Sequence, residues 1–318
     1  MLDREEENQT AITEFILLGF GNLPQLQPLL FVLFLIVFIM SLTGNLLIVL
    51  LIAADQQLHT PMYFFLGNLS GMETCYSLII LPKMLASLII GERTISVCGC
   101  IAQFYFFGSC AGIETYLLAA MSYDRYLAIC RPLHYSTIMH GRFCVQLMAA
   151  TWVNSLLANF IVIIMMAQLS FCGPSVIDHY FCDFIPIVKL SCSDTSVVEI
   201  TTFFFNFIFT VAPFLLTLTS YVCIIATILK IPSTTGRKKA FSTCSSHLIV
   251  VCIFYGTLII VYMLPDSPTL RGLNKVFSIF YTILTPLVNP LIYSLRNQEV
   301  HKALRRVWKK LTISFSNE

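Results

Sequence analysis

The sequence predicts an all-α membrane protein, a seven-transmembrane helix bundle followed by a short amphipathic C-terminal helix. Hydrophobic residues make up 57% of the 318 residues and charged residues only 11%, whereas a water-soluble domain carries about a quarter charged residues. Seven apolar segments are each long enough for a bilayer core of about 30 Å, which takes about 20 helical residues. They are residues 27–54, 60–90, 97–123, 143–169, 197–229, 240–264 and 273–295.

Lysine and arginine residues are divided unevenly between the two sides of these spans, 13 on one side and 6 on the other. Basic residues collect on the cytoplasmic side of a membrane, which puts the N-terminus outside and the C-terminus inside. The chain thus divides into an extracellular tail at 1–26, a transmembrane domain at 27–295 and a cytoplasmic tail at 296–318. That last tail is basic and partly apolar, so it suits a helix lying on the inner leaflet of the bilayer.

The outer tail begins with the acidic string LDREEENQT, not with a basic region before an apolar core. We therefore expect the first membrane helix to serve as the targeting signal. Asn8 begins an Asn-Gln-Thr sequon in this tail, where glycosylation is physically possible.

Two carboxylates fall inside the membrane spans, Glu73 in the second and Glu114 in the third. Glu114 precedes Asp124 by ten residues, about 15 Å of helix, and Glu73 reaches a similar depth near the membrane centre. Two close carboxylates cannot both ionise without a cation or a proton between them. One alternative is a protonated Glu bonded to Asn45 or Asn289, which are also polar residues within the membrane. The other is a site for a monovalent cation.

A further acid-base pair, Asp124 and Arg125, stands at the end of the third span within the string MSYDRYLAIC. Long basic side chains reach for the membrane interface, so this pair alone could be an anchor that sets the depth of the helix. In the seventh span, Pro290 removes a backbone hydrogen bond and predicts a hinge.

Cysteines cluster on the outer side. Cys172, Cys182 and Cys192 recur at ten-residue spacing in the longest outer loop, and Cys98 and Cys100 stand at the outer start of the third span. Outer cysteines meet oxidising conditions, so disulfides are expected there, but the residues alone leave the pairing open.

Five strings occur in the order and spacing of a known family: HTPMYFFL (59–66), GCIAQ (99–103), MSYDRYLAIC (121–130), KAFSTCSSHL (239–248) and PLVNPLIYSLRN (286–297). The chain closely resembles the vertebrate olfactory receptors of the tetrapod-type class, which are rhodopsin-like G-protein-coupled receptors. It departs from them at Glu73, where the family most often has Asp, and in carrying the extra Cys98.

The resemblance implies a receptor of the plasma membrane, and of sensory cilia, that binds a small hydrophobic odorant and activates a stimulatory heterotrimeric G protein, raising cyclic AMP. It implies the disulfides Cys100–Cys182 and Cys172–Cys192. It implies no cofactor apart from a sodium ion at Glu73 and Glu114 in the cation alternative. The residues expected to act in G-protein coupling and activation are Asp124, Arg125, Tyr126, Tyr221, Lys238, Lys239, Asn289, Pro290 and Tyr293.

An odorant pocket is predicted from residues that recur at helical spacing on the third, fifth and sixth spans. Aromatic stripes in membrane helices can equally be packing, but Asn206 and Tyr262 add hydrogen-bonding groups to an apolar set. Phe107 stands where amine receptors carry an acid, which favours a neutral ligand. The predicted lining is Phe104, Phe107, Gly108, Ala111, Gly112, Phe205, Asn206, Phe209, Tyr255, Ile259 and Tyr262.

Other classes of function fit less well. The sequence shows no motif for cradling phosphate, for metal-dependent hydrolysis or for a nucleophile with its base, so we expect no enzyme. The sequence also lacks a basic patch with interleaved aromatic residues, the pattern that would suggest nucleic-acid binding. A transporter or channel using the intramembrane carboxylates is the main alternative, although no inverted internal repeat is visible.

Overall fold

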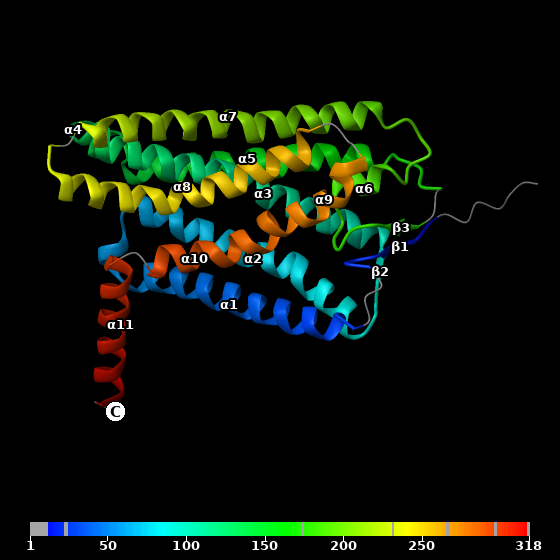
Figure 1. Ribbon diagram of the computed structural model, residues 1–318, viewed down its shortest axis with the longest axis horizontal. Helices are drawn as coiled ribbons and strands as arrows, with labels where there is room; N and C mark the ends of the chain where they lie inside the picture. Colours follow the sequence, from blue (N-terminus) through cyan, green and yellow to red (C-terminus); the bar gives the residue numbers. More distant parts are fainter. Residues whose placement is uncertain are drawn as a thin grey trace, which may run out of the picture.

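The computed structural model describes residues 12–21, 25–172, 175–230, 232–264, 268–295 and 298–316. Its long helices run side by side along one axis (Figure 1). In the described part of the chain, six helices are long and apolar enough to cross a membrane, and α8 adds a shorter apolar stretch. The bundle consists of α1 (Gln27–Ala54), α2 (Pro61–Ile89), α3 (Val97–Cys130), α5 (Gly141–Met166), α7 (Ser196–Leu229), α8 (Thr234–Tyr262) and a seventh helix built from α9 (Pro268–Ile279), η2 (Phe280–Leu284) and α10 (Thr285–Leu295).

The helix starts follow from local sequence. Pro61 occupies the first turn of α2, where its missing N–H costs nothing. The hydroxyl of Ser96 accepts a hydrogen bond from the Gly99 N–H at the start of α3. The ring nitrogen Nδ1 of His140 does the same for α5 by accepting from the Phe143 N–H. Each cap satisfies one of the backbone donors that a helix start leaves unpaired.

The helix α3 lies at the centre of the bundle and contacts α2, α5, α7 and α8. The outward faces of the surrounding helices carry large apolar side chains, such as Leu50 of α1 and Ile200 of α7, which are 64% and 69% exposed. Such surfaces are stable only against lipid, because helices satisfy their own backbone groups while their apolar side chains meet hydrocarbon.

The helices α1 and α10 pack closely at Gly44 of α1. A Cβ atom at Gly44 would lie 3.1 Å from the Cβ of Pro290, so only glycine lets α10 approach this far. The Pro286 carbonyl accepts hydrogen bonds from Ser41 Oγ and Asn45 Nδ2, each at 3.0 Å. Asn45 is fully buried and faces the other helices, which satisfies its amide donor inside the membrane.

At the outer end, the segment expected only as a tail contributes a strand, β1 (Glu14–Leu17). It pairs antiparallel with β2 (Thr94–Ser96) and parallel with β3 (Val176–Ile177). Phe15 and Leu17 alternate inward and are buried, whereas Glu14 is exposed, as the two-residue period of a strand requires. The sheet and the short helix α6 (Phe184–Val188) lie together at one end of the bundle (Figure 1).

The opposite end carries α4 (Pro132–Ile138) and the last helix, α11 (Gln298–Ser316). Figure 1 shows α11 turned across the bundle axis, the orientation of a helix lying in the membrane interface. The guanidinium of Arg306 on α11 pairs with Asp55 after α1, with Nη2 and Oδ2 2.6 Å apart. Asp55 also caps η1 (Gln56–Leu58) by accepting from the Gln57 N–H. This pair fixes α11 to the turn between α1 and α2.

Candidate functional site

A cavity of about 70 Å³ lies between α3, α5 and α7 and is completed by α8 and the long outer loop. Since one water needs about 10–15 Å³ by this measure, the space has room for a small molecule. Nine predicted residues are brought together in its wall. They are Phe104, Phe107, Gly108, Ala111, Gly112, Phe205, Asn206, Phe209 and Tyr262.

The structure corrects the expected lining at Tyr255 and Ile259, which lie outside it. Tyr255 is fully buried, and its hydroxyl donates a hydrogen bond to the Thr115 carbonyl at 2.5 Å. Ile259 follows Leu258 on α8, and one residue along a helix turns the side chain by about 100°. Leu258 and Tyr262, one turn apart, therefore supply the face that α8 presents to the cavity.

Several lining residues were missed. Asp183 and Phe184 come from the outer loop, Asn159 from α5 and Thr202 from α7. Thr202 stands four residues before Asn206, so helical spacing could have found it. Asp183 directly follows Cys182, whose pairing with α3 could have placed it above the pocket.

The two glycines of α3, Gly108 and Gly112, face side chains of α5 at close range. A Cβ atom at Gly108 would collide with Asn159, and one at Gly112 would lie 3.0 Å from Ser155 Oγ. Glycine at these positions thus lets α5 approach closely, and Asn159 reaches the cavity wall.

The carboxyl group of Asp183 is 3% exposed. Its Oδ1 accepts hydrogen bonds from the Phe184 N–H at 2.8 Å and from the Tyr262 hydroxyl at 2.9 Å. Burial raises the pKa of Asp183 to about 6, and the two hydrogen bonds oppose that rise. Asp183 also lines a second, outer cavity of about 320 Å³ between the loop and α9. It therefore stands in the wall between the inner cavity and an outer vestibule.

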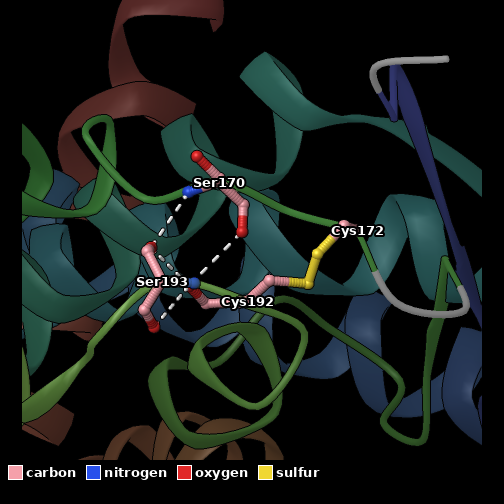
Figure 2. Close-up of a disulfide and its surroundings, with 5 residues drawn as sticks. Ser170, Cys172, Cys192 and Ser193 are labelled. Carbon is pink, nitrogen blue, oxygen red and sulfur yellow. Dashed lines mark hydrogen bonds between the residues drawn. A yellow bond between two sulfur atoms is a disulfide. The ribbon is translucent and has the colours of Figure 1, made fainter. Parts of the chain in front are cut away.

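Both disulfides that the resemblance implies are present. The bond between Cys100 and Cys182 joins α3 to the outer loop, and both residues are fully buried. Figure 2 shows the second bond, between Cys172 and Cys192. Beside it the Cys192 N–H donates to the Ser170 carbonyl at 2.9 Å. Cys98 is exposed and free. Asn8, the glycosylation candidate, lies outside the described residues.

The carboxylates of Glu73 and Glu114 are both 1% exposed and close enough for their charges to interact. Asn289 Nδ2 donates a hydrogen bond to Glu73 Oε1. Within the described residues, neither oxygen of Glu114 has a hydrogen-bond partner, and the Oδ1 atoms of Asn45 and Asn289 have none either. Unpaired buried oxygens are the ligands that a hard cation such as sodium takes, so these residues fit the ion. No group of three or more His, Cys, Asp or Glu gathers in the described chain.

At the end of α3 next to α4, Asp124 is 2% exposed and accepts a hydrogen bond from the Tyr135 hydroxyl of α4 at 2.8 Å. Among the described residues no ion pair within 4.0 Å joins Asp124 to Arg125, whose side chain is half-buried. Tyr126 packs on an apolar cluster that contains Tyr221 of α7.

The remaining coupling candidates lie on α8 and α10. Asn289 and Pro290 are buried in α10. The side chains of Lys238, Lys239 and Tyr293 lie outside the part that the structure describes.

A seven-helix membrane bundle with a small apolar cavity under a disulfide-anchored outer loop defines a transmembrane receptor. The family model for olfactory receptors matches residues 34–310. Olfactory receptor 1f45 of Rattus norvegicus is 48% identical over 300 residues, 94% of this chain and 96% of that protein. Olfactory receptor 11A1 of Homo sapiens is 48% identical over 94% of this chain and 95% of its own length. Olfactory receptor 1E16 of Mus musculus is 47% identical over 98% of this chain and 99% of its own length.

The chain therefore belongs to the olfactory receptor family. It is an odorant receptor of the G-protein-coupled class, a multi-pass membrane protein and not an enzyme. The fold class and the family that the sequence predicts are confirmed.

Proposed function

We propose that this receptor binds a small volatile organic molecule in the cavity between α3, α5 and α7 and activates a stimulatory heterotrimeric G protein at the plasma membrane of sensory cilia, raising cyclic AMP. The observation that carries the cytoplasmic half of this proposal is the pairing of Asp124 with Tyr135 in place of Arg125. The adjacent guanidinium is then available to the carbonyl groups of a partner helix, for which arginine is well suited.

Coupling needs an element with two arrangements whose balance the ligand shifts. The inner part of α8 is the candidate, because it closes the cytoplasmic side of the bundle next to Tyr221 and carries the lysines expected to line the inner opening. In the family this helix swings outward and exposes the arginine of α3. A ligand bound against Leu258 and Tyr262 touches the outer part of the same helix. The helix α8 therefore connects ligand binding to opening on the inner side.

We take a volatile ligand of about 12 heavy atoms as the example. At roughly 0.5 kcal/mol for each atom, the binding free energy is about 6 kcal/mol, which corresponds to tens of micromolar. A ligand panel with a cyclic-AMP readout would identify the agonists and set the concentration range.

The test of coupling is Arg125→Ala, with Arg142→Ala as the matched control. Arg142 is exposed at the start of α5 on the same side of the membrane. We expect Arg125→Ala to abolish the cyclic-AMP response at unchanged surface expression, while Arg142→Ala keeps it. A normal response in Arg125→Ala would contradict the coupling role and favour a membrane anchor.

A further inference from the structure

The inner cavity contains one feature that an apolar odorant pocket does not need. Asp183 is the one charged side chain among the described residues that line it. Both hydrogen bonds to the carboxylate end on Oδ1, and no described residue donates one to Oδ2. A carboxylate that is buried without a cationic partner is destabilised, because it has lost water and gained no counter-charge. A ligand that brings the missing donor removes this cost.

A second polar group in the wall is also without a partner. Thr202 on α7 is 6% exposed, and its Oγ1 has no hydrogen-bond partner among the described residues. The remaining wall is mostly aromatic and aliphatic, with Phe104 and Phe107 from α3 and Phe205 from α7. Pockets of this kind bind the apolar body of a ligand by contact and fix its orientation with a few polar groups.

We propose that this receptor recognises small amines, whose ammonium group binds the carboxylate of Asp183 while the hydrocarbon part fills the aromatic cavity. The inference rests on the proposed function, since it names the ligand class of the same cavity. The counter-charge comes from the outer loop. Amine binding therefore does not need an acid at position 107 of α3, which is Phe107 in this chain.

The rank order of ligands follows from hydrogen-bond chemistry. An ammonium group donates to a carboxylate through a charge-assisted bond, which is about twice as strong as a neutral one. An alcohol of the same shape donates a neutral bond and ranks second. A ketone has no donor, and its oxygen faces the carboxylate oxygen, so it ranks with the hydrocarbon.

The decisive variant is Asp183→Asn. Asparagine keeps an oxygen that accepts from the Phe184 N–H and from Tyr262, and it is as good a helix cap as aspartate, so the variant removes the charge and little else. The probes are a straight-chain amine, alcohol, ketone and alkane of equal length. Binding is measured by thermal stabilisation of the purified receptor, and signalling by cyclic AMP in cells.

In the wild-type receptor we expect the amine to be the most potent of the four. In Asp183→Asn its potency should fall about tenfold or more, while the alcohol changes little. Equal potency of the amine in both proteins, or a wild-type receptor that prefers the ketone, would overturn the proposal. Stabilisation by the amine without a cyclic-AMP response would instead overturn the proposed coupling and leave the ligand class standing.

A measurement on the wild-type receptor needs no variant at all. Because burial raises the pKa of Asp183 to about 6, the carboxyl loses its charge as the pH falls through that value, while an alkylamine stays protonated up to about pH 10. Amine affinity should therefore be constant above pH 7 and fall by up to tenfold per unit below pH 6. A flat profile for the amine down to pH 5 would contradict the proposal.

Other titratable groups near Asp183 do not account for such a profile. Burial, with a smaller effect of Lys275, lowers the pKa of His179 to about 3, so this imidazole stays neutral throughout. The groups that face Asp183 or share the vestibule with it are Asp178, His179 and Lys189 from the loop, Tyr262 from α8, Lys275 from α9 and Tyr281 from η2.

Discussion

The hydroxyl of Tyr221 lies 2.5 Å from Nδ1 of His247 and joins α7 to α8 in the half of the bundle away from the outer sheet. Both side chains are 2% exposed, so this hydrogen bond is shielded from water. If α8 swings outward to admit the G protein, the two atoms separate. The bond thus stabilises the arrangement described here against the open one.

Replacing His247 by Phe should raise basal signalling. A buried hydrogen bond contributes about 1 kcal/mol, so its loss shifts the balance between closed and open receptor up to about fivefold. We expect basal cyclic AMP per surface receptor to rise by a similar factor. Thr219→Ala serves as the control, because the Thr219 hydroxyl donates to the Leu215 carbonyl of its own helix and does not join two helices in the described part of the chain. Basal activity at the wild-type level would show that the bond does not hold α8.

Loss of the bond between Cys100 and Cys182 should block delivery to the cell surface. A native disulfide contributes about 2–5 kcal/mol in small secreted domains, and this one fixes the loop that closes the cavity. Cys182→Ser should be retained inside the cell, whereas Cys98→Ser should reach the surface because Cys98 is exposed and free. Peptide mapping under non-reducing conditions checks the pairing, and a peptide linked through Cys98 would refute it.

Sodium should lower agonist potency if the ion binds between Glu73 and Glu114. The ion would hold α2, α3 and α10 together in the arrangement described here and oppose activation. Replacing sodium by N-methylglucamine in the assay medium should increase the potency of the wild-type receptor and leave Glu114→Gln unaffected. No sodium effect in the wild type would support the other alternative, a protonated carboxyl.

Filling the cavity at Gly112 should discriminate against long ligands. A Cβ atom there would lie 3.4 Å from Phe209 and 3.0 Å from Ser155 Oγ, so the branches of Gly112→Val must project into the remaining space. Overpacking costs about 1–3 kcal/mol, and potency should fall most for the longest member of a homologous series. Gly71→Val is the control, because a Cβ atom at Gly71 meets nothing within 4 Å. Equal losses along the series would place the ligand elsewhere.

The helices and most of the inner cavity could be predicted from the sequence because apolar length and helical period determine them. The spacing of Phe104, Phe107 and Ala111 places them on one face of α3 whatever surrounds the helix. Tyr255 shares that logic on α8 but lies outside the lining. Its hydroxyl reaches the Thr115 carbonyl, and helical spacing cannot say which of two neighbouring turns meets a cavity.

Loop residues could not be placed in the same way. The position of Asp183 depends on a disulfide to α3, on the Tyr262 hydroxyl and on the fold of α6, none of which has a period. Strand β1 could not be predicted for a related reason, because its partner strands lie far away along the chain. The π-helical segment η2 is not predicted, because the visible signal, Pro290, lies nearly two helical turns beyond its end at Leu284.

The sheet at the outer end sets a sequence of events during biosynthesis. Strand β1 is made first, but β2 follows α2 and β3 follows α5. Phe15 and Leu17 are therefore made before either neighbouring strand exists. The first neighbour appears after two membrane helices and the second only after four, so the apolar side chains of β1 wait for their full cover. A lumenal chaperone that binds extended apolar segments has its opportunity during this interval. Pairing of β3 then completes the sheet before α7, α8 and the seventh helix have been made.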